Sequence, residues 1–139
     1  MMKTGCVKVC LLLVAAASTI ARAANSTPAD LAPLFAHIWR IDSPTPYPNS
    51  GSIYVFLSNG TLFEGSCVET YRIATWKADP ANPRTLIVTE DGSPAFAAAI
   101  TELSQTKLRF EQNLLFAKER RDFSLTAVDK EFVCPDLPK

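Results

Sequence analysis

Few residues of this 139-residue chain could carry catalytic chemistry. His37 is the only histidine, so catalysis by an imidazole base would have to use it. The Gly-x-Ser-x-Gly pattern of hydrolase nucleophiles does not occur, and Gly65-Ser66 is followed directly by a cysteine. A lone histidine between a short helix and a strand is more often a structural residue than a catalytic one. We therefore expect no enzymatic activity and no catalytic residue.

Metal binding has as little support. With one histidine, a zinc site would need several carboxylates to converge on His37, and no spacing of acidic residues indicates this. Glu90-Asp91 precedes Gly92, as is typical of a turn. Glu111 stands at an outward position of an alternating segment, so its carboxylate should face solvent. We expect neither a metal nor a cofactor.

Residues 1–23 predict export. Two lysines precede an apolar stretch at 9–17 that is too short to span a bilayer, and Ala21-Arg22-Ala23 matches a signal-peptidase site. We expect residues 24–139 to form a single domain in the periplasm or outside the cell. Cys10 lies inside the apolar stretch, which favours a free protein over a lipoprotein.

The charge of the mature chain excludes some partners. The whole sequence has 14 basic and 14 acidic residues, and the signal segment carries three of the basic ones (Lys3, Lys8 and Arg22) and no acid, which leaves −3. A mildly acidic domain lacks the basic surface that nucleic acids and anionic membranes require. No later apolar run is long enough to span a bilayer. We expect a soluble monomer without nucleic-acid or membrane partners.

Two cysteines, Cys67 and Cys134, remain after cleavage. In an oxidising compartment they allow one intramolecular pairing, so we expect a structural disulfide between them. A redox or metal pair is the alternative, but the Cys-x-x-Cys spacing typical of such pairs is missing.

The remaining pattern is mostly that of short strands. Thr27 and Pro28 are typical of a helix start, and Pro33 should limit that helix to one or two turns ending near Phe35. Asn59-Gly60 lies between two β-rich runs and predicts a hairpin with a type I′ turn. Residues 95–103 are rich in alanine, but their neighbours favour a strand over a helix. The expected strands are 37–42, 52–57, 61–64, 68–77, 85–89, 95–103, 107–111 and 122–127.

Seven or eight short strands joined by tight turns predict an all-β protein, either an antiparallel up-and-down barrel or a sandwich. Across residues 36–127, the order of a strand with Trp39, an Asn59-Gly60-Thr61 turn and a strand from Cys67 to Trp76 resembles small bacterial lipocalin-like and META-domain barrels. The glycine two positions before the tryptophan in many lipocalins is absent, and Gly65-Ser66-Cys67-Val68 replaces the Gly-Cys-Asn of META domains.

The resemblance implies an up-and-down barrel and a role as a ligand carrier or an inhibitor. It also implies that a late-strand arginine, here Arg121, stacks over Trp39. The aromatic residues of the strands favour a filled core, although a barrel of about eight strands can also hold one small ligand. If the barrel is hollow, we expect its wall to include Trp39, Tyr54, Phe56, Tyr71 and Phe110.

Two functions fit this sequence. The first is a non-enzymatic exported barrel that binds a small apolar or amphipathic ligand. The second is a protein-interaction module, such as a periplasmic hydrolase inhibitor, that uses the proline-rich loop around Tyr47 or the hairpin at 113–121. The apolar run at 113–117 can be a buried strand end or an exposed contact, and burial is favoured.

Overall fold

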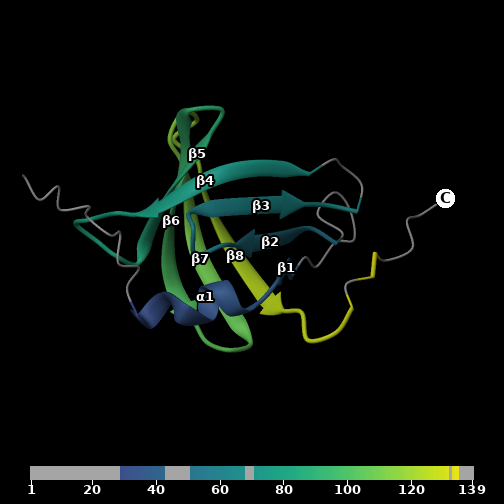
Figure 1. The fold of residues 1–139 in the computed structure, drawn as a ribbon. Helices are drawn as coiled ribbons and strands as arrows, with labels where there is room; N and C mark the ends of the chain where they lie inside the picture. Colours follow the sequence, from purple (N-terminus) through teal and green to yellow (C-terminus); the bar gives the residue numbers. More distant parts are fainter. Residues whose placement is uncertain (1–28, 43–50, 68–70, 132, 135–139) are drawn as a thin grey trace, which may run out of the picture.

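The computed structural model describes residues 29–42, 51–67, 71–131 and 133–134. Eight antiparallel strands close into a barrel in sequence order, and a short helical segment precedes them (Figure 1). The small all-β barrel is therefore confirmed, and the sandwich is wrong. The predicted signal peptide and the loop around Tyr47 lie outside the described residues. The strands are β1 (Trp39–Ile41), β2 (Ile53–Phe56), β3 (Thr61–Gly65), β4 (Arg72–Ala78), β5 (Thr85–Glu90), β6 (Ser93–Leu103), β7 (Lys107–Leu114) and β8 (Arg120–Ala127).

The first strand closes the barrel. Trp39 of β1 is in register with Tyr54 of β2 on one side and with Ala127 of β8 on the other. Just after β1, Asp42 accepts hydrogen bonds from Lys107 Nζ (2.6 Å), Thr126 Oγ1 (2.7 Å) and Ser124 Oγ (3.0 Å). Every strand thus has two neighbours, which removes the free edges that could recruit another chain.

The up-and-down topology gives the barrel two different ends. The β2–β3, β4–β5 and β6–β7 turns lie at the end covered by the helical segment, which we call the closed end (Figure 1). The β5–β6 and β7–β8 turns lie at the other end, which we call the open end. Because side chains alternate along each strand, every second residue points inward, from the closed end to the open end.

A helical plug fills the closed end. It consists of a 3-10 turn (Ala29–Leu31) and α1 (Ala32–Ala36), and Leu31 and Leu34 are fully buried. Trp39 Nε1 donates a hydrogen bond to the backbone oxygen of Leu34 at 3.0 Å. Phe35 stacks on Trp76 with a ring separation of 5.4 Å. The plug is therefore tied to β1 and β4.

Within the described residues, the helical segment begins with a 3-10 turn at Ala29–Leu31 and continues as α1. Thr27 and Pro28 lie outside the described residues, and α1 follows Leu31, which makes no side-chain capping bond. Pro33 lies in the first turn of α1, where a proline removes no helical hydrogen bond. The expected short helix is confirmed, since α1 has five residues and ends at Ala36, close to the predicted end near Phe35.

The β2–β3 hairpin is confirmed, but its turn is not type I′. Gly60 has a φ of +88°, whereas Asn59 does not have a positive φ. The Gly60 amide donates to the Leu57 oxygen at 3.0 Å, and the Leu57 amide donates to the Thr61 oxygen at 2.8 Å. This is the pattern of a three-residue loop that ends in a left-handed glycine. Positive φ at two successive residues occurs instead between β5 and β6, at Asp91 and Gly92.

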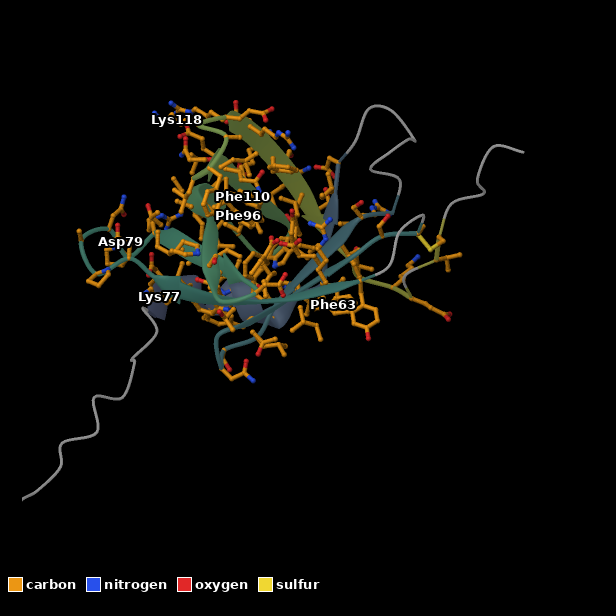
Figure 2. All side chains as sticks on the ribbon, turned by 90° about the horizontal axis from the view of Figure 1, so that it is seen from above. Phe63, Lys77, Asp79, Phe96, Phe110 and Lys118 are labelled. Carbon is orange, nitrogen blue, oxygen red and sulfur yellow. A yellow bond between two sulfur atoms is a disulfide. The ribbon has the colours of Figure 1, made fainter. Side chains whose placement is uncertain are left out.

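The alanine-rich segment is a strand, as favoured from the sequence, and it forms β6. Its inward residues include Phe96 and Ala98, and Figure 2 shows Phe96 and Phe110 within the ring of strands. Cys67 and Cys134 form the predicted disulfide, which joins the residues after β3 to the C-terminal segment. Among the described residues, no helix is long and apolar enough to cross a lipid bilayer.

Candidate functional site

The open end of the barrel contains a cavity of about 410 Å³. The inward positions near the closed end are filled by fully buried side chains such as Leu62, Leu108 and Leu125. The filled core favoured from the sequence therefore describes the closed end, whereas the open end is hollow. The cavity is lined by Ile41, Ser52, Ile53, Tyr54, Glu64, Gly65, Ser66, Arg72, Glu90, Ala95, Phe96, Gln112, Leu114, Arg121 and Phe123.

Aromatic rings separate the cavity from the packed core. Tyr54 and Phe123 line the cavity with their ring centres 6.4 Å apart, in an edge-to-face arrangement. Phe110 backs both of them, stacked on Phe123 at 5.2 Å and edge-on to Tyr54 at 6.0 Å. We call Tyr54, Phe96 and Phe123 the aromatic floor. It offers a ligand an apolar surface on rigid strands.

Four charged residues also line the cavity: Glu64 of β3, Arg72 of β4, Glu90 of β5 and Arg121 of β8. The alternation along the strands explains why charged side chains face inward here. Glu64 is two residues from the buried Leu62, and Arg72 is two residues from the buried Ala74. These positions share the phase of the core but lie at the open end.

The two arginines have acidic partners. Arg121 binds Glu119 with two hydrogen bonds, from Nε at 3.0 Å and from Nη2 at 2.9 Å. Arg72 Nη1 lies 3.9 Å from Glu90 Oε2, across the β4–β5 pair. Although Arg72 is also the register partner of Glu64, no ion pair to Glu64 occurs among the described residues.

Glu64 is the outlier of this group. Its Oε1 atom is buried and has no hydrogen-bond partner in the part of the chain that the structure describes. Burial, and secondarily the charge of Glu90, raise the pKa of Glu64 from 4.5 to about 7, against the opposing effect of Arg72. A buried acceptor without a partner costs about 1–3 kcal/mol of stability, and more when it is charged. Among the described residues, Glu64 therefore contributes to the cavity wall a buried acceptor atom without a partner.

Tyr54 experiences the same set of charges. Its side chain is buried, and this burial, followed by the charges of Glu64 and Glu90, raises the pKa of its hydroxyl. Arg72 and Arg121 oppose the effect. The hydroxyl therefore stays protonated at physiological pH, so it can act as a hydrogen-bond donor. All four charged wall residues thus act on one point of the aromatic floor.

Of the five residues expected to form a ligand wall, only Tyr54 lines this cavity. Phe56 and Phe110 belong to the packed core beneath it, and Trp39 is fully buried beside the helical plug. Tyr71 is 64% exposed and stacks outside the barrel on Phe63 at 5.7 Å. The expectation for Tyr71 is wrong because Ala74 and Trp76 set the inward phase of β4.

The family resemblance implied that Arg121 stacks over Trp39, and the structure contradicts this. The β8 partner of Trp39 is Ala127, six residues from Arg121, or about 20 Å along a strand.

His37 is also at the closed end, where its Nε2 lies 3.0 Å from Gln105 Oε1 and its ring is edge-on to Trp39. The single histidine is thus remote from the cavity. Within the described ranges, no cluster of three or more His, Cys, Asp or Glu side chains could hold a metal ion.

The run at 113–117 is not buried as favoured. Leu114 lines the cavity, but Leu115 and Phe116 are 45% and 78% exposed at the β7–β8 turn. The strand pairing ends at Asn113 and Arg120, so these two side chains lie beyond the ladder and have no opposing strand to cover them. The disulfide is also near the cavity, since Cys67 follows the lining residue Ser66.

Sequence reasoning missed Glu64, Arg72, Glu90, Gln112 and Arg121 as wall residues, although each stands at an inward position of its strand.

Comparison with protein-family models, curated proteins and solved structures gives no match. The resemblance to lipocalin-like and META-domain proteins therefore stays a prediction, and the case for a function depends on the cavity itself.

Proposed function

We propose that this protein is an exported, non-enzymatic barrel that binds one small amphipathic molecule in the cavity at its open end. The observation that carries the proposal is the change along the barrel axis, from a fully packed closed end to a cavity of about 410 Å³. Small-molecule sites are typically concave, preformed and roughly 300–1,000 Å³ in volume, with apolar walls and a few polar groups. The volume falls in this range; the aromatic floor supplies the apolar surface, and charged and polar side chains form much of the remaining lining.

The architecture supports a preformed site. Each strand pairs with two neighbours, so the backbone around the cavity has little freedom to rearrange, and a ligand would pay little ordering entropy. The helical plug blocks the closed end, which leaves the open end as the route of entry. The Cys67–Cys134 disulfide supports a periplasmic or extracellular location, because such bonds persist in oxidising compartments.

A second candidate function has one observation in its favour. Leu115 and Phe116 expose apolar side chains at the β7–β8 turn, one of the two segments expected to contact a protein partner. Exposed apolar residues at a turn can form such a contact. We favour ligand binding because the cavity combines a concave shape, an aromatic floor and charged groups, whereas the turn offers two exposed apolar side chains.

Fluorescence titration with N-phenyl-1-naphthylamine tests the proposal. We expect saturable binding at one site by the disulfide-bonded protein. Ser52 lines the cavity, and Ser52→Trp should fill part of it and weaken binding by about tenfold or more, equivalent to about 1.4 kcal/mol. Thr75→Trp is the matched control, because Thr75 is exposed on the outside of β4. The absence of saturable binding, or equal weakening by both variants, would contradict the proposal.

A further inference from the structure

Glu64 identifies the kind of polar group that a ligand would bring to the cavity. Glu64 lies on β3, where its register partners are Tyr54 of β2 on one side and Arg72 of β4 on the other. The buried Oε1 faces no donor among the described residues. A ligand that places a hydrogen-bond donor at this atom would remove the cost of its burial.

The arrangement of charges favours a positively charged donor. Arg121 donates two hydrogen bonds to Glu119, and Arg72 forms an ion pair with Glu90. Among the described residues, the carboxylates of Glu64, Glu90 and Glu119 therefore stand against two guanidinium groups, and Glu64 is the one of the three without an ion pair. A ligand with one positive charge would balance the group.

We infer that the cavity binds a monocationic amphiphile, such as a primary alkylamine, with its ammonium group at Glu64 Oε1 and its apolar part on the aromatic floor. This inference rests on the proposed function and specifies the chemical class of its ligand. An ammonium has three donors, and its hydrogen bonds to a carboxylate are about twice as strong as those between neutral groups. A ligand carboxylate would meet Glu64 as a like charge and would compete with Glu119 and Glu90 for the arginines.

The other groups around Glu64 do not change this expectation. Among the described residues, the charged or titratable groups that face it from the cavity wall are Tyr54 on β2, Arg72 on β4, Glu90 on β5 and Arg121 on β8. The lining residues of β1, β6 and β7 are uncharged. Burial raises the pKa of the Glu64 carboxyl to about 7.

Calorimetric titration of the wild-type protein with n-octylamine, n-octanol and n-octanoate at pH 8.5 separates the head group from the apolar chain. We expect octylamine to bind at least about tenfold more tightly than octanol, and octanoate to bind most weakly. At pH 5.5 the affinity for octylamine should fall by about 30-fold, because a carboxyl with a pKa of about 7 is then mostly protonated. Octylamine itself stays charged over this range, as a lysine side chain does.

The Glu64→Gln variant keeps the shape of the side chain and removes its charge. It should lose the preference for octylamine and its pH dependence, while its affinity for octanol stays within about twofold of wild type. Glu102→Gln is the matched control, since Glu102 is on the outside of the barrel in an ion pair with Arg109. It changes the net charge equally and should retain the preference.

The outcomes are distinguishable. Tightest binding of octanoate would overturn the inference and assign the head group to the arginines. Equal affinities of the three ligands would overturn the inference while still supporting a ligand cavity. If none of the three binds, the proposed function fails together with the inference. Retention of the octylamine preference by Glu64→Gln would also overturn it.

Discussion

Replacement of Glu64 by glutamine should stabilise this protein at neutral and alkaline pH, although most substitutions in a folded domain do the opposite. The carboxylate is buried without a hydrogen-bond partner for Oε1, and its pKa rises from 4.5 to about 7 on folding. The native state therefore holds a proton more tightly than the unfolded chain does. The stability contributed by this proton is fully present below pH 4.5 and is lost as the pH rises through 7.

The magnitude follows from the same values. A rise of about 2.5 in pKa, at about 1.4 kcal/mol for each pKa unit, sets an upper limit of about 3.5 kcal/mol. Because the cavity opens to solvent, part of this cost is screened, and we expect about 1–3 kcal/mol. The Glu64→Gln variant avoids the cost at pH 8 and should differ little from wild type below pH 5.

Urea unfolding at pH 4.5 and pH 8, followed by the fluorescence of the buried Trp39 and Trp76, measures this difference. Glu102→Gln serves as the control, and its change in the free energy of unfolding should be within about 1 kcal/mol because its ion pair is exposed. A Glu64→Gln variant that is less stable than wild type at pH 8 would refute the reasoning. A stability gain of equal size at both pH values would refute the assigned role of ionisation.

Other parts of the barrel offer tests of similar kind. Replacing Cys67 and Cys134 with serine opens a link across 67 residues and should lower the free energy of unfolding, measured in urea without reductant, by about 4 kcal/mol; a loss under about 1 kcal/mol would contradict this. Gly60→Ala should cost about 1–3 kcal/mol by thermal unfolding, because φ is +88° and the new Cβ would lie 3.1 Å from the Trp76 oxygen; an unchanged midpoint would count against the turn described above. Asp42→Asn should cost about 1–3 kcal/mol in urea at pH 7. Burial alone would raise the pKa of Asp42, but its hydrogen bonds lower it below 3.8, so the stabilisation is lost as the pH falls below that value and the two proteins should converge in acid.

The fold was largely predictable because it depends on local patterns. Alternating side chains identified the strands, and Asn59-Gly60 and Asp91-Gly92 marked their turns. The turn type at Asn59-Gly60 was not predictable, because both the two-residue and the three-residue hairpin loop accept this pair. The 3-10 turn that precedes α1 was not predicted from the sequence. The stability of the helical plug comes from the burial of Leu31 and Leu34 in the barrel end rather than from a cap, and such packing is not visible in a short segment.

The site was much less predictable. Alternation tells which side chains point inward but not whether that part of the barrel is filled, so Trp39 and Phe110 could not be distinguished from Tyr54. At the start of β4, the exposed Tyr71, just before the strand, and Ile73 within it make the outer face look like the apolar one. A usable signal was present on β3, since Glu64 follows Leu62 at the inward spacing. A charged residue at an inward position near the end of a strand indicates that this end of the barrel is open.

The central claim, that the open end binds a ligand, is tested most directly by mapping the site. Amide chemical shifts of the ¹⁵N-labelled protein would be followed while n-octanol is added, since this neutral ligand does not depend on the head-group inference. We predict saturable shifts at Tyr54, Gln112 and Phe123 and none at Leu34 or Trp39 of the closed end. Shifts confined to Tyr71 and Ile73 on the outer face, or no saturable shifts, would contradict the account.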